Sequence, residues 1–289
     1  MIGLVSAELL KIRRRQATYV LLVIELVLTG LIFLPTGAIY KIAGIIEFPA
    51  AYALFKEAAF SLGGLIAIVF AAAYVGADWN WGVLRNVVAR GESRERYLLA
   101  KAIALAIVLA IFLVIVFAAC FVFTYMQSLI YGLPVANPLR GNGLQDLVVW
   151  IVVGYPVLLQ RAMIGLAVAA AFRSQLSGAV VGIVLFLVES VVTTILTVLT
   201  FGSNLVNNGG LGEGPTTPAG NQWFQFLPIS MGGNVFNALP GSGGVTSSGD
   251  VSSLLLQPVP FAVAMGGVVL YTVGALFIAM FALRRQEIA

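Results

Sequence analysis

The sequence predicts an all-helical membrane protein with six transmembrane spans. Its residues are 60% hydrophobic and only 10% charged, and the mean hydropathy is +1.02. Soluble domains carry about 25% charged residues, so a soluble fold of 289 residues could not bury this much apolar surface. The apolar runs are continuous rather than alternating, which favours helices over a β-barrel as the structure that satisfies the backbone in lipid.

Six apolar segments are long enough to cross a bilayer, which takes roughly 20 residues of helix. They are residues 17–40, 58–77, 99–125, 147–172, 177–201 and 259–283. Basic residues gather in residues 1–16, in the segment after the second span, after the fourth span and in the tail, whereas the opposite side carries Lys41, Lys56 and Arg140. Positive charge marks the cytoplasmic side. Both termini are therefore expected in the cytoplasm, and the net charge does not indicate nucleic-acid binding.

Residues 1–16 are expected to form an amphipathic helix at the cytoplasmic interface. Four apolar residues recur there at helical spacing, namely Ile2, Val5, Leu9 and Ile12. Glu8, Lys11 and Arg15 fall elsewhere on the helical wheel. Such a helix can lie in the plane of the membrane surface, although a basic flank that only sets the topology has the same composition.

Residues 78–97 are expected to form a cytoplasmic loop that contains a short helix. Asp78 suits the N-cap of that helix, and Gly91 suits its end. Ser93 is expected to cap the helix that leads into the third span. The loop helix would carry an apolar stripe and basic residues beside it: Trp81, Leu84 and Val88, with Arg85 and Arg90. Such an element is not needed to cross a bilayer, so we expect it to contact a partner in the cytosol.

Residues 202–256 are expected to form a long extracytoplasmic loop. The segment contains twelve glycines, four prolines and neither Lys nor Arg, a composition typical of irregular structure. Within it, the apolar and aromatic residues 222–241 are expected at the outer interface or folded back into the protein.

Three charged residues fall inside the spans: Glu25, Arg161 and Glu189. Each costs roughly 2.5–3.5 kcal/mol at the centre of a membrane helix, so they should face protein or water. Arg161 and Glu189 lie on consecutive antiparallel spans and could form an ion pair, which Glu25 could join. Such charges either fix helix packing or belong to a permeation path.

The fifth span combines small and polar residues on one face. Gly178 and Gly182 form a GxxxG pair that permits close helix packing. Glu189, Thr193 and Thr197 follow toward the outer half. They could line a polar cavity, or the threonines could bond to their own helix backbone in ordinary packing.

Several kinds of chemistry are missing from the sequence. It has no histidine and a single cysteine, Cys120, which suits a small core residue in the third span. No glycine-rich phosphate loop followed by Lys-Ser or Lys-Thr is present, so the chain is not expected to hydrolyse ATP by that route. We therefore expect neither a catalytic site nor a bound metal or cofactor, which favours a transport or scaffold role.

The chain resembles the permease subunits of bacterial type-2 ABC exporters over nearly its whole length. The resemblance rests on the opening ELLKIRRRQATYVLL, the six spans, the loop WGVLRNVVARGESRERYLLAK, and FLPISMGG before the last span. The family's motifs for the first cytoplasmic loop look like Asp78, residues 81–85 and residues 93–101. The resemblance implies one permease domain over residues 1–289.

In this family, two permeases pair in the membrane above two ATPase subunits, which bind ATP and Mg²⁺. By resemblance, residues 80–90 would be the coupling helix, with Trp81, Leu84, Arg85 and Arg90 contacting the ATPase, and residues 1–16 would be the interfacial helix. The second and fifth spans would line the pathway, the fifth with Glu189, Thr193 and Thr197. The expected function is export across the bacterial cytoplasmic membrane. A non-transport scaffold that transmits ATPase motion and an ion-coupled secondary carrier are the alternatives.

Overall fold

The computed structural model describes residues 1–40, 51–81, 83, 89, 93–132, 143–208, 223–238 and 259–284. Across these residues the regular structure is helical, with no strand. Six helices are long and apolar enough to cross a membrane: Gln16–Pro35, Leu54–Trp79, Arg94–Tyr131, Gln145–Phe172, Gln175–Leu199 and Phe261–Arg284. The predicted all-helical class with six spans is therefore confirmed.

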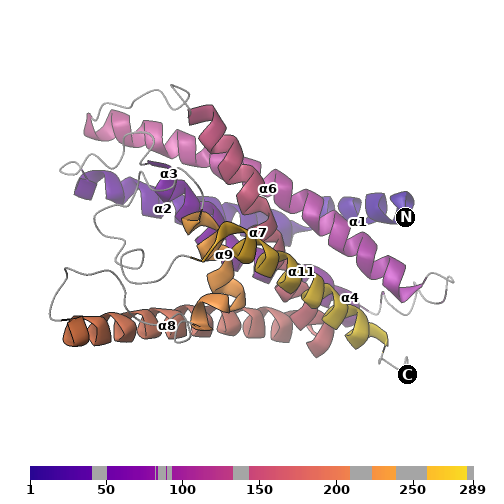
Figure 1. The fold of residues 1–289 in the computed structure, drawn as a ribbon. Coiled ribbons are helices and arrows are strands. Elements are labelled where there is room, and N and C mark those ends of the chain that lie inside the picture. The colour runs from indigo at the N-terminus through magenta and orange to yellow at the C-terminus, as the bar shows by residue number, and fades with distance from the viewer. Residues whose placement is uncertain are drawn as a thin grey trace. The chain divides into compact units, whose positions relative to one another are not determined.

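The helices follow one another along the chain as Figure 1 shows. They are α1 (Ile2–Arg14), α2 (Gln16–Tyr40), α3 (Ala51–Lys56), the π-helix η1 (Glu57–Leu62), α4 (Gly63–Asn80), α6 (Arg94–Tyr131), α7 (Gly143–Phe172), α8 (Gln175–Asn208), the short 3₁₀ helix η3 (Trp223–Phe226), α9 (Pro228–Asn237) and α11 (Phe261–Arg284). At 1.5 Å per residue, α6 is about 57 Å long, so it extends well beyond a hydrocarbon layer of about 30 Å.

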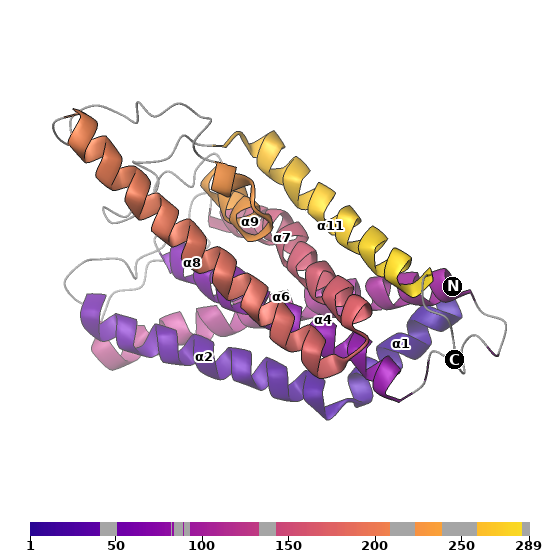
Figure 2. The same ribbon diagram turned by 90° about the horizontal axis from the view of Figure 1, so that it is seen from below.

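The chain divides into two compact units. The first comprises Met1–Ile183 and Thr272–Ala289, and the second comprises Val184–Tyr271. In the first unit, α4 packs along α7, and α6 packs against both α1 and α2. Figure 2 shows α1 and α2 meeting at a bend, where Arg15 adopts an extended conformation that ends α1.

Glycines permit the close packing inside the first unit. A Cβ atom on Gly165 of α7 would lie 2.3 Å from the backbone oxygen of Ile68 in α4. A Cβ atom on Gly76 of α4 would lie 2.4 Å from the Cα atom of Gln175. Real Cβ atoms do not approach other atoms so closely, so a larger residue at either position would push the backbones apart.

The GxxxG pair at the start of α8 also lies at close contacts. A Cβ atom on Gly178 would lie 2.8 Å from the Cα atom of Ala169, and one on Gly182 would lie 2.5 Å from the Cγ2 atom of Ile68. Both positions therefore bring α8 close to its neighbours within the first unit, as helix-packing residues do.

The predicted start of the loop helix is wrong. Asp78 does not cap a new helix, because α4 continues through it to Asn80 and ends with Trp81 at the C-cap. The Asp78 side chain is buried and, as described below, has a cationic partner inside the protein. Ser93 caps α6 as predicted, and its Oγ atom accepts a hydrogen bond from the Arg96 amide at 3.3 Å. Leu84, Arg85, Val88, Arg90 and Gly91 lie outside the described residues.

The first residues of the predicted loop at 202–256 are helical rather than irregular, and its place outside the membrane stays a prediction. Helix α8 continues to Asn208, since the chain contains no proline between the start of α8 and Pro215 to end it. Further along, η3 and α9 form from the aromatic stretch, with Phe224, Met231 and Phe236 buried. The stretch thus buries part of its apolar surface within the second unit, while Trp223 and Phe226 stay exposed, so the choice between the two predicted locations stays open. Residues 209–222 and 239–258 lie outside the described part of the chain.

Candidate functional site

Three helices bring opposite charges together at one end of the first unit. The Nζ atom of Lys101 in α6 lies 3.2 Å from a carboxylate oxygen of Glu8 in α1 and 2.5 Å from one of Asp78 in α4. All three side chains are at most 6% exposed. Tyr97 donates a hydrogen bond to Asp78 at 2.6 Å, and Tyr74 donates one to Glu8. We call these five residues the charge cluster.

The charge cluster holds two buried carboxylates around one buried ammonium group. Lys11, which is 43% exposed, adds a second ion pair to Glu8 from the rim. Burial by itself opposes ionisation of Glu8, but the charges of Lys101 and Lys11 and the hydrogen bonds from Lys11 and Tyr74 outweigh it, so the pKa of Glu8 lies below its ordinary value. Glu8 is therefore ionised at neutral pH despite its burial.

The position of the charge cluster gives it a mechanical consequence. Asp78 lies near the end of α4, before residues 82–92, and Lys101 lies in the third turn of α6, after them, while Glu8 belongs to α1. The cluster therefore ties the end of α4, the start of α6 and the N-terminal helix to one another.

The charge cluster is not predicted by the sequence pattern. The helical wheel placed Glu8 away from the apolar stripe, yet Glu8 and Ile12 are the buried residues of α1, and Ile2 is 89% exposed. Lys101 is one of the basic residues that follow the second span, and in the sequence it indicates only topology. The available clue was that Glu8 and Asp78 are acidic residues next to spans on the predicted cytoplasmic side, where each would need a cation.

Of the four residues predicted to contact a cytosolic partner, Trp81 is described. It is 69% exposed, and the guanidinium carbon of Arg15 lies 4.9 Å from the centre of its ring. Trp81 therefore contacts the joint between α1 and α2 and still presents most of its surface. Leu84, Arg85 and Arg90 lie outside the described residues, so their predicted role stays a prediction.

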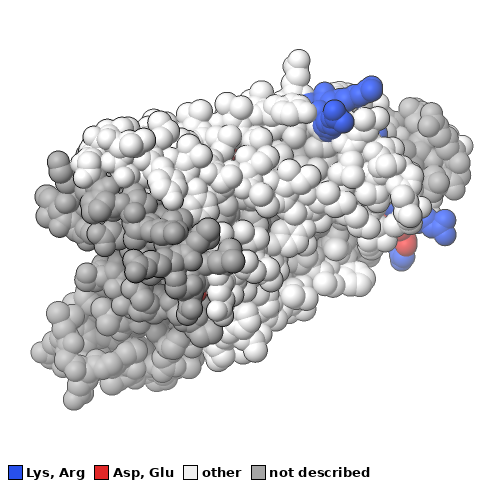
Figure 3. Space-filling view, turned by 90° about the horizontal axis from the view of Figure 1, so that it is seen from above, with Lys and Arg blue, Asp and Glu red and all other residues white. Residues whose placement is uncertain are grey.

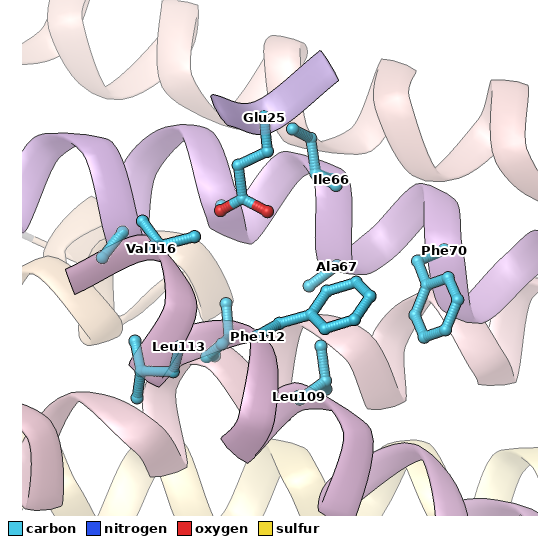
Figure 4. Close-up of a pocket in the computed structure, with 11 residues that line it drawn as sticks. Glu25, Ile66, Ala67, Phe70, Leu109, Phe112, Leu113 and Val116 are labelled. Carbon is cyan, nitrogen blue, oxygen red and sulfur yellow. The ribbon is translucent and has the colours of Figure 1, made fainter. Parts of the chain in front are cut away.

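Glu25 is buried within the second helix, beside a small cavity. A Cβ atom on Gly63 would lie 2.6 Å from the Oε1 atom of Glu25, so a larger residue there would displace the carboxylate. The cavity has a volume of about 10 Å³, close to the least that holds one water molecule. Figure 4 shows the Glu25 carboxylate pointing into the space between helices, with Phe112, Leu113 and Val116 of α6 among the apolar side chains around it.

Arg161 of α7 is buried against the π-helix. Its Nη1 group donates a hydrogen bond to the backbone oxygen of Phe60 in η1. A π-helix changes the backbone hydrogen-bonding pattern and is frequent at functional sites. A Cβ atom on Gly64 would lie 2.2 Å from Nη1 of Arg161. The adjacent glycines 63 and 64 thus leave room for Glu25 from α2 and Arg161 from α7.

Glu189 stabilises the start of α9 inside the second unit. Its Oε1 atom accepts hydrogen bonds from the backbone amides of Ile229 at 2.6 Å and Ser230 at 2.9 Å. A carboxylate is favourable at a helix N-terminus, where free amides and the helix dipole attract negative charge. This contact gives Glu189 a packing role. The ion pair between Glu189 and Arg161 would connect the two units and stays a prediction.

The two threonines of α8 bond to their own helix. The hydroxyl groups of Thr193 and Thr197 each donate a 2.8 Å hydrogen bond, to the backbone oxygens of Glu189 and Thr193 respectively. With their hydrogens used in this way, both hydroxyls can still accept hydrogen bonds from another group. A role in lining a pathway stays a prediction.

The six spans define the chain as an all-helical, multi-pass membrane protein with charges buried between its helices. A protein family described as "Protein of unknown function (DUF2705)" matches residues 41–207, which is more than half of the 289 residues. The chain belongs to this family. Among curated proteins, none matches the chain.

Proposed function

We propose that this protein is the membrane-spanning permease subunit of an ATP-driven ABC exporter in the bacterial cytoplasmic membrane. The energy would come from two copies of a separate ATPase subunit, which bind ATP and Mg²⁺, and a second permease copy or a homologous permease would complete the membrane domain. The observation that best supports the proposal is the charge cluster. It couples both ends of residues 82–92, the segment proposed to contact the ATPase, to the N-terminal helix.

The charge cluster suggests how a movement of the ATPase subunits would reach the membrane helices. When the ATPase subunits close on ATP, they would displace residues 82–92. Because Lys101 holds Asp78 and Glu8 at 2.5 and 3.2 Å, α4, α6 and α1 would move together rather than singly. The close packing of α4 on α7 would carry the displacement into the membrane, since packed helices transmit strain.

Several parts of the chain that we assign to the cytoplasmic side lie together in the first unit. Arg284 near the end of α11 pairs with Glu95 in the first turn of α6, at 2.5 Å between nitrogen and oxygen. The start of α6 also carries the charge cluster that holds α1. The N-terminal helix, the two ends of residues 82–92 and the end of α11 therefore share one end of this unit. We propose that this end faces the cytoplasm, because basic residues are concentrated there. Figure 3 shows Lys and Arg side chains gathered near one end of the visible face.

The test of this proposal is co-expression with an ABC ATPase subunit from the same organism, followed by reconstitution in liposomes. Replacing Leu84 and Arg85 together with Ala should reduce ATPase co-purification or uncouple ATP hydrolysis from substrate flux. Lys56→Ala, on the predicted opposite side, should leave both unchanged. Equal coupling in the double variant and the wild type would remove the case for this segment as the contact with the ATPase.

An ion-coupled secondary carrier is the second candidate, and the burial of Glu25 and Arg161 within spans favours it. Flux driven by an ion gradient without ATP would support the carrier, whereas flux that requires ATP and the ATPase would support the exporter. A scaffold that transmits ATPase motion would give ATP hydrolysis without flux.

A further inference from the structure

The geometry points to a binding site for the phosphate headgroup of an anionic phospholipid at the joint between α1 and α2. A groove of about 200 Å³ opens there, next to the exposed ring of Trp81. Its walls come from the α1–α2 joint, from α4 and from Gln175 at the start of α8, all within the first unit. This inference goes beyond the proposed function and does not depend on it.

Arg15 supplies the positive charge of this groove. Its guanidinium carbon lies 4.9 Å from the ring centre of Trp81 and 5.9 Å from that of Tyr74. One of its amino groups donates a long hydrogen bond, 3.4 Å, to the backbone oxygen of Tyr74. Within the described part of the chain, Arg15 forms no ion pair with a carboxylate.

The guanidinium is thus held in place by aromatic rings and keeps most of its five donors for a ligand. A guanidinium can donate two parallel hydrogen bonds to a phosphate, which gives the contact both strength and direction. Arg15 is the one charged residue among those that line the groove. Arg13 and Arg14 add positive charge outside the groove, on the exposed surface of α1. The net field therefore favours an anionic headgroup over a zwitterionic one.

The remaining walls explain why the ligand is a lipid rather than a free phosphate. Leu21 and Phe70 line the groove on α2 and α4, at positions that lie inside the two spans. The groove therefore joins a cationic end to an apolar surface that continues along membrane helices. A phospholipid matches this order with its phosphate and its acyl chains. The exposed Trp81 is of the kind found at membrane interfaces, where its ring suits the headgroup level.

Native mass spectrometry of the full-length chain in mild detergent tests the site. Phosphatidylglycerol is titrated in, and the first bound lipid is compared among variants. Arg15→Gln should weaken its binding at least about tenfold, because a charge-assisted hydrogen bond is lost. Arg14→Gln is the matched control, since it removes the same charge one residue away, outside the groove, and it should change binding by less than about twofold. Arg15→Lys keeps the charge without the planar donor pair and should fall between them.

Three results would overturn the proposal. They are the absence of saturable lipid binding in the wild type, equal losses of lipid affinity in Arg15→Gln and Arg14→Gln, or displacement of the lipid by inorganic phosphate at the same concentration. The last would identify a phosphate site without lipid preference. Unfolding temperatures of all variants establish that the comparison is between folded proteins.

A second measurement keeps the wild-type arginine and so does not depend on the folding of Arg15→Gln. Brominated phosphatidylglycerol should quench tryptophan fluorescence more than brominated phosphatidylcholine does, and this excess should disappear in Trp81→Phe. It should persist in Trp223→Phe, which changes an exposed tryptophan of the second unit. An excess that survives in Trp81→Phe would place the bound lipid elsewhere and refute the site.

Discussion

Lys101 holds two buried carboxylates, so its replacement by methionine should destabilise the protein severely. Methionine keeps an unbranched side chain of similar length but leaves Glu8 and Asp78 without the ammonium that lies 3.2 and 2.5 Å from them. Breaking a buried ion pair by removing one partner typically costs about 3–5 kcal/mol. We expect a loss in this range, because both acids depend on the same cation.

Protonation of the buried carboxylates limits the loss of stability in Lys101→Met. A buried carboxylate without its cation takes up a proton instead of staying charged. For Glu8, whose ordinary pKa is 4.5, neutralisation at pH 7 costs about 3.4 kcal/mol, at 1.36 kcal/mol per pKa unit. Lys11 continues to pair with Glu8 from the rim and reduces this cost. The defect of Lys101→Met should therefore shrink as the pH is lowered toward 5.

The assay is reversible unfolding of the purified chain in mixed micelles, followed by circular dichroism. Lys11→Met is the matched control, because Lys11 also pairs with Glu8 but is 43% exposed. Because its ammonium lies at the rim, where water screens it, and Lys101 still pairs with Glu8, we expect the loss in Lys11→Met to be about 1 kcal/mol. The triple variant Glu8→Gln, Asp78→Asn and Lys101→Met should recover most of the stability, since replacing a whole buried ion network by neutral groups is often tolerated.

Two results would refute this account of the charge cluster. One is an equal loss of stability in Lys101→Met and Lys11→Met, which would mean that burial does not strengthen the pair. The other is a triple variant no more stable than Lys101→Met alone, which would mean that the single variant fails through lost packing rather than through unpaired charge.

The remaining predictions concern Glu8, Gly165 and Glu189. The pKa of Glu8 is lower in the folded protein than its ordinary value of 4.5. The stability that Glu8 contributes should therefore be complete above pH 4.5 and should disappear as the pH falls through the folded-state pKa. Glu8→Gln should flatten this part of the plot of unfolding free energy against pH. Gly165→Ala places a methyl group 2.3 Å from the Ile68 oxygen and should lower the free energy of unfolding by about 1–3 kcal/mol. Gly274→Ala, with open space around it, is the control and should be neutral or slightly stabilising in the same unfolding measurement. Glu189→Gln should alter flux or substrate-stimulated ATPase activity while assembly persists; a change in expression and unfolding temperature alone would leave Glu189 with only its role at the start of α9.

Helix positions inside the membrane could be predicted because they depend on local composition. A span is recognised from a run of apolar residues, since lipid requires every backbone polar group to be satisfied within the helix. Each of the six predicted segments overlaps one of the six spans of the structure. The cap at Ser93 was also predictable, because a cap involves residues only three positions apart.

Helix ends outside the apolar runs were less predictable. Asp78 was assigned to a new helix because aspartate suits an N-cap, yet α4 continues through it. An aspartate near a helix end fits either a cap or an ion pair, and here the Asp78 side chain pairs with Lys101, 23 positions along the chain. Likewise, glycine-rich composition suggested a loop from residue 202, but α8 continues to Asn208 because glycine alone does not end a helix.

Hydropathy and flanking charge are properties of consecutive residues, so the amino-acid order is enough to predict a helical, six-span membrane protein with basic residues concentrated at particular span ends. The partners of the buried charges follow from helix packing instead: Glu8 meets Lys101, which also pairs with Asp78, and Glu189 meets the amides of α9 about 40 positions away. A buried charge is stable only beside a partner. Helical periodicity places it on a face of its own helix, whereas the packing of several helices supplies the partner.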